Sequence, residues 1–130
     1  MPKYILDGEL DIEPLLNMRK LLKKILTEAE DEIDEMAAVQ AFEVCYELTW
    51  HTCQKVLKYQ GRVARFPREI FCLSAELGLI KDPEVWFEFM DVRNSTSHTY
   101  DVNVLDQIFS LLPRFIREFD LLIKNLQKLK

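Results

Sequence analysis

The sequence predicts an all-α protein. Apolar residues recur at spacings of three and four almost throughout the chain, while the alternation typical of β-strands is nearly absent. Only 3 Gly and 5 Pro occur among 130 residues, too few for the many turns of a β-sandwich or barrel. Because no repeat, low-complexity stretch or long linker divides the chain, we expect a single domain over residues 1–130.

The first two expected helices are long. Residues 12–26 carry an apolar stripe beside a mostly basic remainder. A second helix is expected over 34–59, preceded by an acidic run at 28–35, and acids favour helix N-termini because the amides there carry partial positive charge. This helix is apolar over so much of its circumference that we expect it to be central. Gly61 follows its end, where a left-handed cap residue is common.

Prolines organise the second half of the chain. A short helix is expected from 67 to 78, opened by a proline and closed by a glycine. Asp82 followed by Pro83 is typical of an N-cap and a first-turn proline, which predicts a fourth helix. The last helix should begin at 101 or 103 and run toward 128, with Pro113 either kinking or splitting it.

Composition and charge exclude several classes of function. With 17 basic and 22 acidic side chains the net charge is −5, so no broad basic surface for duplex DNA is expected. No apolar run approaches the roughly 20 residues of a membrane span, and the first residues lack a signal-peptide core, so we expect a cytoplasmic protein without a membrane partner. The spacing of Cys45, Cys53 and Cys72 suggests neither a disulfide framework nor a zinc site, and no cofactor motif is present.

One polar segment, residues 91–101, departs from this packing pattern. Arg93 falls four residues after Phe89 and continues the apolar stripe of the fourth helix, where a charge needs acceptors. His98 and Tyr100 follow a run of small polar residues. Guanidinium binds phosphate through paired hydrogen bonds and imidazole transfers protons near neutral pH, so this set suits cleavage of RNA, which brings its own 2′-hydroxyl nucleophile. The alternative is a capped helix end with a buried arginine–acid pair.

The same segment carries a family resemblance. Residues 93–101 resemble the R-x4-6-H signature of HEPN domains, in the R-N-x-x-S-H-x-Y form of the HepT-like, nucleotidyltransferase substrate-binding branch. Residues 41–50 are similar to that branch's second-helix pattern F-E-x-x-x-E-L-x-W. Similar residues also occur at three further places: 66–70, 78–80 and Trp86. Phe66 departs from the pattern, since a serine-like cap is expected before Pro67.

The resemblance implies an up-down bundle of four to five helices that forms a homodimer and is encoded beside a small, MNT-type nucleotidyltransferase. In toxin–antitoxin members, the HEPN subunit is a metal-independent ribonuclease that the partner silences by transferring AMP to a tyrosine. On this sequence, Arg93 would stabilise the phosphate, His98 would transfer protons and Tyr100 would accept AMP. Asn94 and Ser97 would either support the turn or bind the phosphate less strongly. The older family label implies instead a non-catalytic subunit that presents substrate to the nucleotidyltransferase.

Three other features have two interpretations each. Glu43 and Glu47, four residues apart on the second helix, either pair with Arg93 or form an exposed strip. Asp91 and Asp101 bracket the motif and could orient its arginine or its histidine, or Asp101 simply caps the last helix. The basic segment 62–68 is either a solvated loop or a guide for RNA or for an acidic partner.

Overall fold

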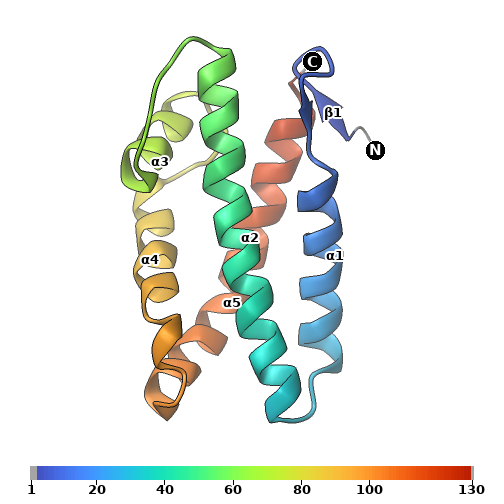
Figure 1. The fold of residues 1–130 in the computed structure, drawn as a ribbon, viewed down its shortest axis with the longest axis vertical. Coiled ribbons are helices and arrows are strands. Elements are labelled where there is room, and N and C mark those ends of the chain that lie inside the picture. Colours follow the sequence, from blue (N-terminus) through green and yellow to red (C-terminus); the bar gives the residue numbers. More distant parts are fainter. Residues whose placement is uncertain (1–2, 130) are drawn as a thin grey trace.

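The computed structural model describes residues 3–129, and these form a bundle of five α-helices (Figure 1). The helices are α1 (Glu13–Glu28), α2 (Glu32–Tyr59), α3 (Pro67–Glu76), α4 (Pro83–Asn94) and α5 (Val102–Gln127). A 3-10 turn, η1 (Thr96–His98), links α4 to α5, and a short hairpin of β1 (Tyr4–Ile5) and β2 (Leu10–Asp11) precedes α1. The predicted all-α class and helical bundle are confirmed; positions 1, 2 and 130 of the expected domain lie outside the described residues.

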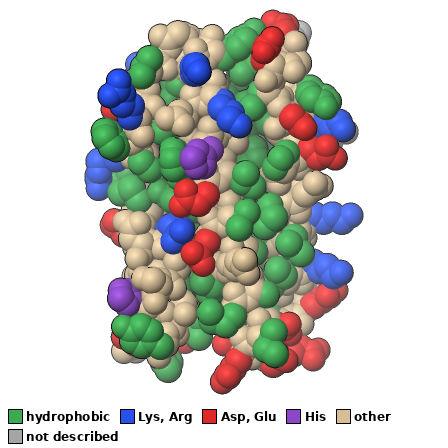
Figure 2. All heavy atoms as spheres, viewed as in Figure 1, with side chains coloured by type: hydrophobic (Ala, Val, Ile, Leu, Met, Phe, Trp, Pro, Cys, Tyr) green, Lys and Arg blue, Asp and Glu red, His purple; other side chains and the backbone are tan. Residues whose placement is uncertain are grey.

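Helix α2 lies at the centre of the bundle, as its apolar circumference predicts. It contacts each of the other four helices that the structure describes. Its N-cap is Asp31, whose side chain accepts a hydrogen bond from the Asp34 amide at 2.9 Å, so the helix begins inside the acidic run. One face nevertheless stays exposed at the front of Figure 1, and Figure 2 shows hydrophobic, acidic and basic side chains on that surface.

The N-terminal hairpin was not predicted. Its strands are two residues long, too short to show any alternation, and the turn places Leu6 and Asp7 at positive φ, 55° and 57°. The Tyr59 hydroxyl donates a hydrogen bond to Asp7 at 3.0 Å, which ties the turn to the end of α2. Four apolar side chains of this segment are buried: Ile5, Leu6, Leu10 and Ile12. The hairpin therefore covers one end of the core.

Helix α5 runs unbroken through Pro113, so a split at this proline is wrong. Proline removes one intrahelical hydrogen bond and favours a bend. In Figure 1 the first turns of α5 run obliquely below α4, and the rest rises beside α1. Leu112 and Phe115, on either side of the proline, are fully buried. We attribute the continuity of the helix to this burial.

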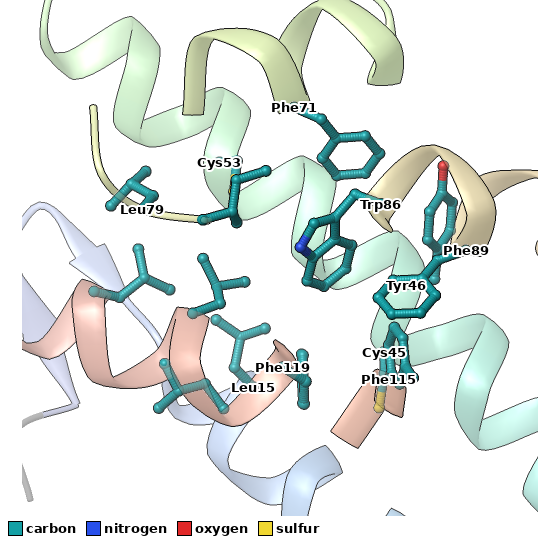
Figure 3. Close-up of a cluster of buried hydrophobic side chains, with 14 of the residues drawn as sticks. Leu15, Cys45, Tyr46, Cys53, Phe71, Leu79, Trp86, Phe89, Phe115 and Phe119 are labelled. Atoms are coloured by element: carbon teal, nitrogen blue, oxygen red, sulfur yellow. The ribbon is translucent and has the colours of Figure 1, made fainter. Parts of the chain in front are cut away.

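Aromatic packing fixes α4 against α2 and α5 (Figure 3). The ring of Phe115 lies 4.9 Å from Phe42, 5.7 Å from Trp86 and 5.1 Å from Phe89, centroid to centroid. Phe119 stacks on it at 5.6 Å. Because Trp86 and Phe89 belong to α4, this cluster sets the position of the helix whose end carries the polar segment.

The start of α3 lacks the side-chain cap that the resemblance predicts. Phe66 occupies the N-cap and is 68% exposed, and its extended backbone suits a capping serine. Phe66→Ser should stabilise the protein by about 1 kcal/mol, measured by urea denaturation, because the hydroxyl can accept from a free amide of the first turn. Phe66→Ala is the matched control; if it stabilises as much as serine, capping is not the cause.

Candidate functional site

The polar segment forms the junction between α4 and α5. Helix α4 ends at Asn94 because two hydroxyls bond back to its last carbonyls. The Ser95 hydroxyl donates to the Val92 carbonyl at 2.7 Å, and the Thr96 hydroxyl donates to the Arg93 carbonyl at 2.8 Å. These bonds satisfy groups that a helix end leaves free and turn the chain into η1.

The same junction also starts α5. Asp101 caps this helix by accepting a hydrogen bond from the Asn103 amide at 2.9 Å. Of the two interpretations of Asp101, capping is therefore confirmed.

Arg93 faces α2 and pairs with Glu43 and Glu47, the two glutamates on the exposed face of that helix. Its Nη1 lies 3.2 Å from Glu43 Oε2 and donates to Thr96 Oγ1 at 3.0 Å. Its Nε lies 3.4 Å from Glu47 Oε1, but the two are not aligned as a hydrogen bond. Pairing is therefore the correct interpretation of the glutamates. Because these contacts use at most three of the five N–H donors of a guanidinium, donors remain for a phosphate.

Glu47 is itself held in place by neighbouring aromatic side chains. Its Oε2 accepts a hydrogen bond from Trp50 Nε1 at 2.8 Å and lies 3.8 Å from His51 Nε2. With Glu43 nearby, two carboxylates surround one guanidinium, which leaves this part of the surface with an excess of negative charge. The charge on Arg93 is thus largely neutralised within the chain.

A groove of about 790 Å³ runs along the exposed face of α2 and includes Arg93 and Thr96 in its lining. Its other walls are mainly apolar: Ile33 is 78% exposed, Met36 49% and Val44 38%. In Figure 2 a blue side chain flanked by red ones lies beside a band of green ones in the middle of this face. Arg93 therefore lies at the border between a charged and an apolar surface.

His98 and Tyr100 lie together at the surface. Nδ1 of His98 is 3.0 Å from the Tyr100 hydroxyl, and the two rings meet edge to face at 5.7 Å. Tyr100 is 82% exposed, so its hydroxyl is open to a macromolecular partner. Within the described chain no hydrogen bond or ion pair joins His98 to Arg93, whose ion pairs are both with α2.

The supporting polar residues differ from those that the motif indicates. Asn94 and Ser97 are exposed, whereas the bonds that shape the junction come from Ser95 and Thr96. Thr96, 6% exposed, also orients the guanidinium, a role that the sequence analysis missed. Its position three residues after Arg93, within bonding reach of a helix-terminal carbonyl, was the available signal.

The buried ionisable groups of α2 do not supply a nucleophile. Burial raises the pKa of Cys45 to about 12 and that of Cys53 to about 11, so both thiols stay protonated. Burial, with the nearby Glu47 carboxylate, also raises the pKa of Tyr46. Within residues 3–129, no cluster of three or more His, Cys, Asp or Glu side chains is arranged to hold a metal ion.

Comparison with known proteins assigns the family. Residues 12–128 match the profile of the family described as "Nucleotidyltransferase substrate binding protein like". The chain belongs to this family. The match begins after the hairpin, so residues 3–11 are outside the part of the chain that the nucleotidyltransferase substrate-binding family defines. The predicted HepT-like resemblance is confirmed at the level of the family.

Individual proteins are also similar to this chain. A protein of Haemophilus influenzae named "Probable ribonuclease HepT" is 28% identical over 96 residues, which is 70% of this chain and 66%, just under two thirds, of that protein. A crystal structure from Thermus thermophilus has a TM-score of 0.79 and 27% identity, covering 86% of this chain and 98% of that one. A Haemophilus influenzae structure, described as the fold of a substrate binding domain of a nucleotidyltransferase, has a TM-score of 0.79 and 23% identity, covering 87% and 96%.

The helices were compared with the requirements of a membrane span. Among the helices of residues 3–129, none combines the length and the apolar character required to cross a bilayer.

Proposed function

We propose that this protein is the HEPN subunit of a two-component module: a toxin-type, metal-independent ribonuclease of the cytoplasm, paired with a small MNT-type nucleotidyltransferase. The observation that carries the proposal is the exposed His98–Tyr100 pair at the end of the helix that also presents Arg93. The family match and the printed name of the Haemophilus influenzae relative support it.

The cleavage step follows from the chemistry of these groups. The ribose 2′-oxygen attacks the adjacent phosphorus, the bond to the 5′-oxygen breaks, and a 2′,3′-cyclic phosphate and a 5′-hydroxyl form. His98 takes the proton from the attacking 2′-hydroxyl and gives it to the leaving 5′-oxygen, so the imidazole ends the step unchanged. Arg93 donates hydrogen bonds to the phosphate oxygens, whose negative charge increases in the transition state.

A homodimer completes the site in this proposal. Arg93 and His98 do not touch within one chain, and Arg93 borders the groove whose exposed apolar side chains include Ile33, Met36 and Val44. A second copy seated on this groove removes those side chains from water and brings a second polar junction toward Arg93. Two copies of each catalytic group then share one cleft.

Transfer of AMP to Tyr100 is the proposed silencing reaction. The phenolic oxygen bonds to the α-phosphorus of ATP, the bond to pyrophosphate breaks, and pyrophosphate leaves. The phenolic proton passes to Nδ1 of His98, 3.0 Å away. Once attached, the phosphate lies beside the imidazole and occupies the space that an RNA phosphate needs.

A labelling experiment tests the proposed function. The protein is incubated with the small nucleotidyltransferase encoded beside it, Mg²⁺ and ATP labelled at the α-phosphate, and the wild-type chain should gain label and lose ribonuclease activity. Tyr100→Phe should take no label and remain active, since it lacks only the acceptor oxygen. Tyr4→Phe, at a tyrosine 54% exposed, is the matched control. Equal labelling of Tyr100→Phe and wild type would exclude Tyr100 as the acceptor.

A second candidate function is a non-catalytic subunit that presents substrate to the nucleotidyltransferase. The pairing of Arg93 with two carboxylates favours it, because a neutralised guanidinium attracts phosphate less strongly. This candidate predicts a stable complex with the nucleotidyltransferase and no cleavage of RNA in EDTA at any protein concentration.

A further inference from the structure

Positive charge is concentrated in one segment of this acidic chain. Residues 55–68 contain five basic side chains and no acidic one, so the rest of the chain carries −5 − 5 = −10. The five are Lys55, Lys58, Arg62, Arg65 and Arg68. They occupy the last turns of α2, the loop after it and the start of α3. In Figure 2 blue side chains lie on the upper part of the face that α2 exposes.

Four of these cations line a hollow of about 430 Å³, here called the basic hollow: Lys55, Lys58, Arg62 and Arg65. Gln54 shapes it by donating a hydrogen bond to the Ala64 carbonyl at 2.8 Å, which holds the loop against α2. Arg62 pairs with the exposed Glu76 at 3.1 Å. The other three have no ion-pair partner among the described residues, so their charge is available to a ligand.

Two exposed aromatic side chains lie near these cations. Tyr59 lines an adjoining hollow together with Lys55 and Lys58, and Phe66 directly follows Arg65 in the chain. Tyr59 is 48% exposed and Phe66 is 68% exposed, and both lie within the basic segment. Cations that follow the backbone, interleaved with rings on which bases stack, are the combination that binds single-stranded nucleic acid without reading its sequence. Bases can stack on these rings while the cations hold the backbone, so the combination favours RNA.

The basic hollow lies on the same face of α2 as the candidate site. Glu47, His51, Lys55 and Lys58 follow one another at helical spacings of four, four and three. At 1.5 Å per residue, Lys55 is about 12 Å and Lys58 about 16 Å along the axis from Glu47, the partner of Arg93. A few nucleotides span that distance.

The candidate site needs such an anchor, because its own surroundings are acidic. Glu43 and Glu47 outnumber Arg93, so the long-range attraction of RNA cannot come from there. The other dense group of cations, on α1, is partly neutralised, since Arg19 and Lys23 both pair with Asp120. The basic hollow is therefore the stronger anion-binding surface of the two.

We infer that the basic hollow binds the backbone of single-stranded RNA beside the scissile phosphate, with Tyr59 and Phe66 as stacking surfaces. The inference rests on the proposed ribonuclease function for its purpose, although the binding itself requires no cleavage. Lys55 and Lys58 are binding residues of this subsite and take no part in the chemical step.

Binding of a fluorescent oligouridylate, measured by anisotropy as the salt concentration rises, tests the inference. All proteins carry His98→Ala so that the RNA stays intact. The double variant Lys55→Gln/Lys58→Gln should weaken binding about tenfold at low salt. It should also make the slope of log affinity against log salt concentration shallower by about 1.4, because each of two lost phosphate contacts contributes about 0.7. Lys20→Gln with Lys24→Gln, two exposed lysines of α1, removes the same charge and should change affinity less than about twofold.

The outcomes separate the two proposals. An equal loss of affinity in both lysine pairs, or no loss in either, overturns the basic hollow as an RNA subsite. Loss of nucleotidyltransferase binding with full RNA affinity also overturns it and makes the surface a protein-docking site. If the wild-type protein cuts no RNA, while the Lys55/Lys58 variant loses RNA affinity and the Lys20/Lys24 variant does not, the ribonuclease proposal fails and the RNA subsite stands.

Discussion

Replacing His98 by alanine should slow RNA cleavage in EDTA by about 10²–10⁴-fold, the usual contribution of a positioned acid–base group. Arg93→Ala should slow it by about 10²–10³-fold, because the transition-state phosphate loses its fixed donors. Cleavage is measured with a fluorescent RNA at saturating substrate, and the 2′,3′-cyclic phosphate is identified in the products. Cleavage that persists unchanged in both variants would exclude these residues from catalysis.

Thermal melting of the same variants separates catalysis from architecture. His98 is exposed and its side chain contacts the exposed Tyr100, so His98→Ala should have the melting temperature of the wild type. Arg93→Ala leaves Glu43 and Glu47 without their counter-charge, yet these carboxyl groups are 31% and 38% exposed and water screens them. Unfolding of Arg93→Ala at room temperature would indicate that the motif serves structure alone.

Two further arginine variants sharpen this test. Arg93→Lys keeps the charge but loses the planar fork, so its cleavage rate should stay near that of Arg93→Ala. Arg114→Ala is the matched control: Arg114 forms an ion pair with Glu88 and lies 5.7 Å from the Phe89 ring, on a helix outside the motif. Its activity should equal that of the wild type.

The helices could be placed from the sequence because their ends carry local signals. Asp82 accepts a hydrogen bond from the Glu84 amide at 2.9 Å, and a proline follows it, as the capping pattern predicts. Gly61 and Gly78 adopt positive φ, both 79°, just after the two helices that they were expected to end. Such signals act within one turn of a helix, which is why single-sequence reasoning detects them.

The contacts of the site could not be predicted in the same way. Arg93 meets Glu43 and Glu47 across two helices, and their register depends on packing that no local pattern encodes. For this reason pairing and exposure remained equal alternatives for the glutamates. The hairpin was missed because its stability comes from burial of Ile5 and Leu10 against the bundle and from the bond between Asp7 and Tyr59.

Phe115→Ala should lower the free energy of unfolding by about 3–5 kcal/mol, a large part of the total for a domain of this size. Phe115 is fully buried, and its ring touches aromatic side chains of α2, α4 and α5, so alanine removes apolar surface and leaves a cavity that these rings cannot fill. Guanidinium denaturation measures the change. The slope of the unfolding free energy against denaturant concentration should equal that of the wild type if unfolding stays two-state.

The matched control is Phe109→Ala, at a partly exposed phenylalanine of the same helix. It changes helix propensity equally but buries less surface, so its loss should be smaller by about 1 kcal/mol or more. Phe115→Leu, which retains most of the apolar volume, should lose less stability than Phe115→Ala. Equal losses at 109 and 115 would show that burial in the aromatic cluster does not determine the loss, because Phe→Ala favours the helix at both positions. The cluster would then not be what holds α4, and with it Arg93, against α2.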